Sequence, residues 1–180
     1  MSKNPKVVVA AFVFTIAILT VGYLAFGVLT DLIFASGFLT GFLLWLFVKA
    51  KPSFEQIKLP YWITLIMFII HRVEEKTMNF FNRLAEITGV PTPEIASFEV
   101  IALVVVSVGA WLSIPFLMKR RYDFGYYLGW TFFSAMGITE LAHFVFPFFL
   151  DEPYSYFPGM ASVIILAPVA WWGMKRLSEN

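Results

Sequence analysis

The stretch VVVAAFVFTIAILTVGYLAFGVLT, residues 7–30, decides the fold, because it contains no charged side chain over 24 positions. A spanning helix needs about 20 mainly apolar residues, and a cleavable signal has an apolar region of only about 7–15. Lys3 and Lys6 precede this stretch, and a second apolar run, residues 32–49, follows almost at once. The chain is therefore expected to enter a membrane at its first span and to remain there.

The composition of the whole chain points the same way. Of the 180 residues, 59% are hydrophobic, 14% are charged and 21 are Phe. Typical soluble domains are about 45–50% apolar and about 25% charged, so we expect an integral membrane protein. The formal net charge of +1 provides no field for binding nucleic acid. The chain has no Cys, which excludes disulfides, thiolate metal sites and thiol nucleophiles.

Six segments are apolar enough to be predicted as spanning helices of a single all-α bundle that occupies residues 1–180. They are residues 7–29, 32–49, 60–82, 97–118, 124–149 and 157–174. If the amino terminus is cytoplasmic, most Lys and Arg residues fall on the cytoplasmic side. The positive-inside rule therefore predicts a multi-pass protein with both termini cytoplasmic, in a bacterial-type inner membrane or a plasma membrane.

The only two histidines lie inside predicted spans, and each has a Glu three residues away. They belong to the sequences HRVEE, which begins at His71, and ELAH, which ends at His143. Residues three or four apart share a face of a helix, so Glu75 should face the same way as His71, and Glu140 the same way as His143. An ionisable side chain near the bilayer centre costs about 3 kcal/mol even on the mildest scale. Both pairs are therefore candidates for a functional site.

The residue types of these pairs favour a metal. Counted at about 1.5 Å per residue along each span, the two pairs reach similar depths in the outer half of the membrane. Imidazole and carboxylate ligands suit zinc or non-haem iron, and we predict that the His and Glu side chains of the two pairs are the ligands. The predicted ligands are His71, Glu75, Glu140 and His143. We predict Glu74 as the general base, acting on a water whose pKa the metal lowers to about 7.

Three other interpretations of the cluster stay open. A buried ion-pair network, with Arg72 neutralising nearby carboxylates, would fix the helix register without a ligand. A metal-free site could protonate an alkene in a sterol-like or isoprenoid-like substrate, as an isomerase or cyclase does, because burial raises carboxyl pKa values. A carrier would use the same groups to bind a proton or cation in transit. Glu99, on the fourth predicted span, could reach the same depth.

Three short motifs stand in order in the second part of the chain. They are HRVEE at residues 71–75, the second histidine at His143, and Tyr156-Phe157-Pro158-Gly159. Through these motifs the chain resembles the HXXEE domain family of small membrane proteins, which also carries a second histidine and a YxPG motif. The resemblance extends from the third predicted span to the sixth. It supports the site but implies no reaction, and the assignment of Glu140 rests on spacing and depth alone.

These observations together favour an enzyme. We expect a metal-dependent hydrolase or group-transfer enzyme whose partner is a membrane lipid or a hydrophobic small molecule, because the site lies beside the acyl region. Tyr156 should approach from the outer side, where its phenol could donate to a substrate carbonyl or a developing oxyanion. It could equally be an interface anchor. Ser36, Gly37 and Gly41 are small residues that favour close helix packing or a homodimer contact.

Overall fold

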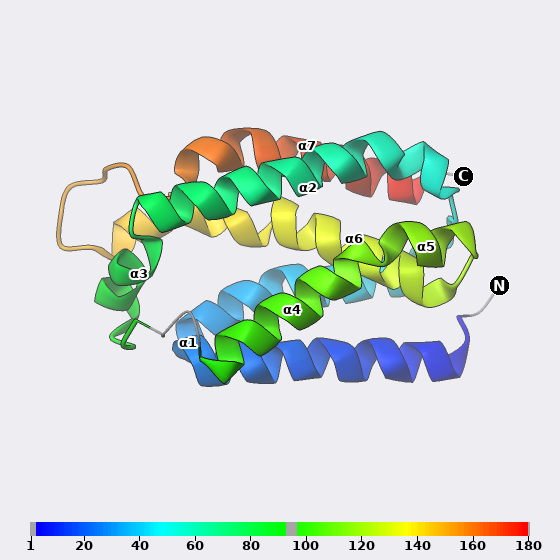
Figure 1. The fold of residues 1–180 in the computed structure, drawn as a ribbon, viewed down its shortest axis with the longest axis horizontal. Coiled ribbons are helices and arrows are strands. Elements are labelled where there is room, and N and C mark those ends of the chain that lie inside the picture. The colour runs from blue at the N-terminus through cyan, green and yellow to red at the C-terminus, as the bar shows by residue number, and fades with distance from the viewer. Residues whose placement is uncertain (1–2, 93–96, 180) are drawn as a thin grey trace.

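The computed structural model describes residues 3–92 and 97–179, and over these residues the protein contains helices and no strands. The longer helices run roughly along one long axis, and the short α3 lies at one end of the bundle (Figure 1). They are α1 (Pro5–Phe47), α2 (Phe54–Thr77), α3 (Phe80–Thr88), α4 (Phe98–Leu112), α5 (Ile114–Lys119), α6 (Asp123–Gly137) and α7 (Met160–Ser178), with the 3-10 helices η1 (Thr139–Phe144) and η2 (Phe146–Phe149) between α6 and α7. The predicted all-α class is confirmed.

The helical segment α1 consists of two antiparallel arms joined at Gly27. This glycine has φ 77° and ψ 179°, a backbone conformation outside the helical region that L side chains rarely adopt. The rings of Phe12 and Phe42 lie 6.1 Å apart, whereas the same stretch of straight helix would separate them by about 45 Å. Figure 1 shows the two arms in dark and light blue. They overlap the first two predicted spans, but the break at Gly27 lies inside the predicted span 7–29 and not between residues 29 and 32.

Two segments, Pro5–Phe47 and Val100–Lys119, are long and apolar enough to cross a membrane. In each, only 22% of the most apolar stretch is buried inside the protein, so most of its apolar surface faces outward. Lipid-facing helices have such a surface, whereas a core helix of a soluble protein is mostly covered. The second segment covers α4 and α5 and agrees with the predicted span 97–118.

Two predicted spans differ from the helices in the structure. The span predicted at 60–82 is shifted: α2 begins earlier, at Phe54, includes Pro60, and ends at Thr77. Asn79 then adopts a left-handed conformation with φ 58° that breaks the helix. The span predicted at 124–149 is α-helical only as far as Gly137 and continues as the 3-10 helices η1 and η2. The α-helix ends where Ile138 leaves helical geometry, with φ −124° and ψ −54°. Pro147 lies further along, at the start of η2, and so does not cause the change.

The central helix of the bundle is α6, where every residue from Gly125 to Gly137 is buried. The second arm of α1, α5 and α7 pack around it (Figure 1). Gly41 allows the closest approach, since a Cβ at this position would lie only 2.6 Å from the Cα of Thr131. The predicted role of the small residues in helix packing is thus confirmed for Gly41. This close packing places the carboxyl end of α6, and η1 after it, deep among the other helices.

The end of the bundle where both ends of the chain lie (Figure 1) is formed by the start of α1, the α1–α2 and α5–α6 connections and the end of α7. These segments contain Lys3, Lys6, Lys49, Lys51, Lys119, Arg120, Arg121, Lys175 and Arg176. Near that end, Lys51 forms an ion pair with Asp123, and Arg121 Nη1 donates a hydrogen bond of 2.7 Å to the carbonyl of Lys51. At the opposite end, next to α3, Arg83 contacts Glu86 at 2.7 Å and Glu152 at 3.1 Å. The two ends of the bundle therefore differ in charge.

Candidate metal centre

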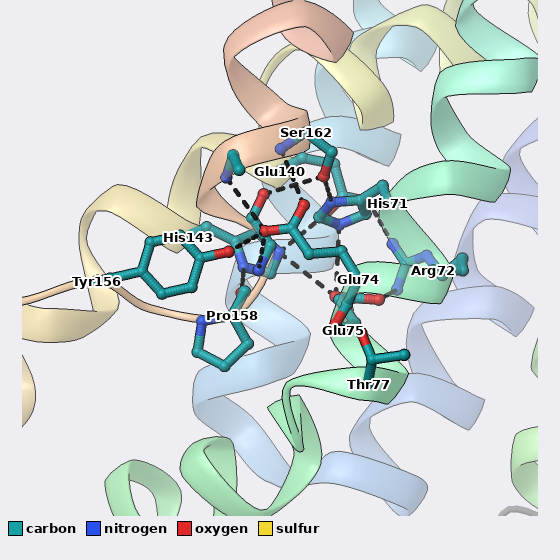
Figure 2. Close-up of polar contacts among 12 residues, drawn as sticks. His71, Arg72, Glu74, Glu75, Thr77, Glu140, His143, Tyr156, Pro158 and Ser162 are labelled. Atoms are coloured by element: carbon teal, nitrogen blue, oxygen red, sulfur yellow. Dashed lines mark hydrogen bonds and ion pairs between the residues drawn. The ribbon is translucent and has the colours of Figure 1, made fainter.

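Two helices bring the four predicted ligands into one buried cluster (Figure 2). His71 and Glu75 come from α2, and Glu140 and His143 come from η1. All four are nearly inaccessible, with exposed fractions of 0%, 3%, 6% and 2% in chain order. Residues four apart share a face of an α-helix, and residues three apart eclipse each other in a 3-10 helix. Each pair therefore points in one direction, although η1 is not the α-helix that was predicted.

The ligand atoms of the four side chains converge. The Nε2 atom of His71 lies 3.4 Å from Oε1 of Glu75 and 3.2 Å from Oε2 of Glu140. The Nε2 atom of His143 lies 3.4 Å from each of the same two oxygens. One ligand atom from each residue lies within 4.8 Å of all the others. Two nitrogens and two oxygens thus surround one point.

The guanidinium of Arg72 binds the remaining oxygen of each carboxylate. Its Nη1 lies 2.6 Å from Oε2 of Glu75, and its Nη2 lies 2.5 Å from Oε1 of Glu140. A guanidinium is a planar fork of donors, so it can hold both carboxylates in fixed orientations. Each Glu therefore directs one oxygen to the histidines and the other to Arg72. The sequence allowed Arg72 to neutralise nearby carboxylates. In the structure it pairs with two of them, Glu75 and Glu140.

Hydrogen bonds on the far side of each imidazole fix the tautomer. The Nδ1 atom of His143 lies 2.5 Å from the carbonyl oxygen of Pro158, which can only accept, so Nδ1 carries the proton. The Nδ1 atom of His71 lies 2.8 Å from Oγ of Ser162, whose hydroxyl donates to the carbonyl of Gly159 at 3.1 Å. That Oγ therefore accepts from His71. When the rings are neutral, Nε2 of each keeps its lone pair and directs it into the cluster.

Four sets of lone pairs repel one another unless positive charge lies between them. Protons on both Nε2 atoms would supply it, but charge-assisted N–H···O bonds are about 2.7–2.9 Å long. The spacings between the imidazole nitrogens and the carboxylate oxygens are 3.2–3.4 Å. Ligands placed about 2.0–2.1 Å from a zinc ion in a tetrahedron are about 3.3–3.4 Å apart, as these four nitrogen–oxygen pairs are, and the nitrogen–nitrogen and oxygen–oxygen pairs lie within 4.8 Å. The residues therefore fit a metal ion, and nitrogen and oxygen ligands suit zinc or non-haem iron.

Glu74 caps the start of α7. Its Oε1 accepts from the backbone N–H groups of Gly159 at 3.0 Å and Ala161 at 3.2 Å, and its Oε2 accepts from Ser162 N–H at 2.9 Å. The Tyr156 hydroxyl also donates to Oε1 (Figure 2). Partial burial, together with this hydrogen bond, raises the pKa of the Tyr156 phenol to about 12, so it remains a donor at neutral pH. An anion is favoured at a helix amino terminus.

The turn that leads into α7 fits closely against the histidines. Gly159 has φ 100°, and a Cβ on it would lie 2.8 Å from Cε1 of His71 and would overlap the ring of His143. Phe157 is fully buried and its ring packs against that of Phe146 in a tilted arrangement, with 5.0 Å between ring centroids. Residues of all three sequence motifs therefore meet in one place.

Two partners of the histidines, Ser162 and the carbonyl of Pro158, were not predicted from the sequence. A serine near the start of a helix is too common to indicate a ligand partner, and a backbone carbonyl has no residue-type signal. The predicted catalytic pair, Glu74 and Tyr156, is brought together, and the polar atoms of both residues are engaged as described above. Glu99 was expected to approach this depth, but its side chain lies outside the described part of the structure.

Two cavities adjoin the cluster. The smaller has a volume of about 120 Å³, and its walls include Glu75 and His143. The larger has a volume of about 320 Å³ and extends past mostly apolar side chains to Trp111. Arg72 and Glu140 line both cavities. The polar cluster is therefore next to an apolar space that is large enough for a ligand.

Comparisons with curated proteins and with solved structures found no match. The sequence model of a family described as "Protein of unknown function with HXXEE motif" matches residues 62–173, more than half of the chain. This range includes all four clustered His and Glu residues, the arginine that binds the two carboxylates, and the turn before α7. The chain therefore belongs to this HXXEE family.

Proposed function

We propose that the protein is an intramembrane metal-dependent enzyme of the hydrolase or group-transfer type that acts on a lipid-like substrate. The observation that carries this proposal is the spacing of two imidazole nitrogens and two carboxylate oxygens at 3.2–3.4 Å, beside a cavity. This spacing suits zinc or non-haem iron better than it suits imidazolium–carboxylate hydrogen bonds. The largely apolar cavity supports a hydrophobic substrate.

In this proposal His71, His143 and Glu75 are the permanent ligands. Catalytic zinc sites have three protein ligands and keep a further position for water or substrate. Glu140 is the carboxylate that lines both cavities, so we assign it as the ligand that gives way to the substrate and accepts a proton during the reaction. When bound, the metal would polarise a substrate carbonyl and lower the pKa of a water to about 7.

Glu74 and Tyr156 act in this scheme through the start of α7. Their contacts hold the turn whose Pro158 carbonyl and Ser162 hydroxyl orient the two imidazoles. Partners that hydrogen-bond to the second nitrogen of a ligating His fix its tautomer and ring orientation. We therefore assign Glu74 and Tyr156 as positioning residues. The roles predicted from the sequence, general base for Glu74 and oxyanion donor for Tyr156, are the alternative.

The charge difference between the two ends of the bundle supports a membrane orientation. We propose a multi-pass arrangement in which the basic end, with both termini, is cytoplasmic. The chain has no Cys, so the labelling of a single introduced Cys shows on which side of the membrane that position lies. A Cys at Glu55 should react with a membrane-impermeant maleimide only after permeabilisation, and a Cys at Glu152 should react in intact cells. Both side chains are well exposed, at 64% and 60%. The reverse labelling pattern would contradict this orientation.

Elemental analysis of the detergent-purified protein tests the metal centre directly. We expect about one zinc or iron per chain, and none after His71→Ala and His143→Ala are combined, because two of the three permanent ligands are then absent. Glu152→Gln is the control, since this exposed carboxylate lies outside the cluster. Equal metal content in wild type and the double variant would refute the proposal. It would favour the metal-free isomerase or cyclase, in which the same carboxyls supply the acid.

A further inference from the structure

We infer that the substrate is a single-chain acyl ester or amide with a small polar leaving group, and that it enters sideways between α2 and α4. Its hydrocarbon chain would lie in the larger cavity, its carbonyl beside Arg72 and Glu140, and its leaving group in the smaller cavity. The reaction at the carbonyl rests on the proposed metal-dependent function. The position of the bound molecule rests on the cavities alone.

The opening of the cavities lies between α2 and α4. Arg72 on α2 and Val104 on α4 both line both cavities, yet the Arg72 side chain is 42% exposed and Val104 is 52% exposed. Within the described residues no Cα of α2 comes within 8 Å of a Cα of α4, and Figure 1 shows α4 diverging from α2 toward the α3 end. Val73 and Ile101 are large apolar side chains exposed on the same two helices. A molecule dissolved among acyl chains can therefore reach the cluster without crossing water.

The larger cavity fits one hydrocarbon chain. Its wall on α4 extends from Leu103 to Trp111, a distance of about 12 Å at the helical rise per residue. Phe68 and Met136 line it from α2 and α6. Its volume of about 320 Å³ is at the lower end of the range for drug-sized ligands, about 300–1,000 Å³. One chain fits this space, whereas a lipid with two chains does not.

The smaller cavity offers a polar partner to the leaving group. Thr30 lines it and is only 4% exposed, and the Thr30 hydroxyl has no hydrogen-bond partner among the described residues. A buried polar group left without a partner costs about 1–3 kcal/mol, so a ligand atom that bonds to it gains affinity. The volume of about 120 Å³ limits the leaving group to a compact one.

The reacting carbonyl would lie where the two cavities meet. Arg72 and Glu140 belong to both walls, so a molecule that extends through both cavities must pass these two residues. In hydrolysis, the hydroxyl of a water forms the new bond to the acyl carbon while the bond from that carbon to the leaving oxygen or nitrogen breaks. The proton of the water passes through Glu140 to the leaving atom. Water is the only co-reactant.

Photolabelling with a molecule that cannot be hydrolysed tests the binding position. The probe is a 12-carbon methyl ketone with a diazirine near the end of its chain, added to the purified protein. We expect peptide mass spectrometry to find adducts at the wall of the larger cavity, on Phe68, Trp111 or Met136. Val104→Trp should reduce labelling about tenfold by filling the opening. Val105→Trp is the matched control, because Val105 is 64% exposed and lines neither cavity.

Competition by two related esters tests the smaller cavity. The 2-hydroxyethyl and ethyl esters of dodecanoic acid differ by one hydroxyl, and Thr30→Val removes the hydroxyl of Thr30 with little change of shape. The hydroxyethyl ester should lose about fivefold in potency against the probe in Thr30→Val, the effect of one hydrogen bond, while the ethyl ester is unchanged. Equal effects on both esters would overturn this placement of the leaving group.

The outcomes separate this inference from the metal proposal. Adducts confined to lipid-facing positions, or equal labelling of Val104→Trp and Val105→Trp, would overturn the inference even if the protein binds one metal per chain. If Val104→Trp reduces labelling but the protein contains no metal, the binding site is supported and the metal chemistry is refuted. If Val104→Trp does not fold, the adduct map of the wild-type protein decides.

Discussion

Replacing Gly159 by Ala is expected to be among the most damaging single substitutions in the chain. The residue has φ 100°, and the added Cβ would overlap the His143 ring and lie 2.8 Å from Cε1 of His71. The left-handed backbone alone costs about 1–2 kcal/mol, and overpacking a buried site costs about 1–3 kcal/mol more. Neither ring can move away without losing its hydrogen bond on Nδ1. Both stability and metal content should therefore fall.

Gly89→Ala is a matched control for this substitution. Gly89 also has a positive φ, 67°, but nothing lies within 4 Å of the position its Cβ would take. The two variants share the backbone penalty, and only Gly159→Ala adds the collision with the histidines. Thermal unfolding in detergent, measured with and without a chelator, should show a larger loss for Gly159→Ala, and only this variant should lose metal. Equal losses and unchanged metal content in both would contradict the proposed contact.

The sequence predicted the two His/Glu pairs of the cluster because local spacing determines each pair. His71 and Glu75 are four apart on one α-helix, so their common direction follows from helix geometry alone. Glu140 and His143 were assigned to an α-helix and lie on a 3-10 helix. The pairing survives this change because residues three apart stay on one side in both kinds of helix. The hydropathy of this segment could not reveal the change, since it reflects apolar character and not the backbone conformation at Ile138, where α6 ends.

The partners of these ligands could not be predicted in the same way, because they come from distant parts of the chain. The carbonyl of Pro158 reaches His143 only because Gly159 adopts a positive φ and leaves room for the rings. No spacing within the HRVEE motif indicates which side chain or amide a given Glu will meet. The sequence predicted a general base in Glu74, and the structure adds that its oxygens contact a helix amino terminus that lies 85 residues and more along the chain.

Replacing Glu74 by Gln should distinguish a positioning role from a general-base role. The carboxylate accepts bonds from three backbone N–H groups at the start of α7 and from Tyr156. Gln keeps one acceptor oxygen and presents an NH₂ group, which cannot accept, at the position of the other. Bonds to a charged group contribute about 1.5–3 kcal/mol each, so we expect a loss of about 3 kcal/mol in stability. Metal affinity should fall about 10–100-fold, because the turn that orients both imidazoles loosens.

The two roles give different results in the same measurements. If Glu74 is a general base, Glu74→Gln abolishes turnover but leaves the melting temperature and the zinc affinity at their wild-type values. If Glu74 positions α7, both quantities fall together, and zinc restores part of the lost stability because it binds only the folded site. Glu86→Gln is the matched control, since Glu86 is an exposed carboxylate that contacts only Arg83 among the described residues. A wild-type zinc affinity in Glu74→Gln would therefore favour the general-base role and contradict the positioning role.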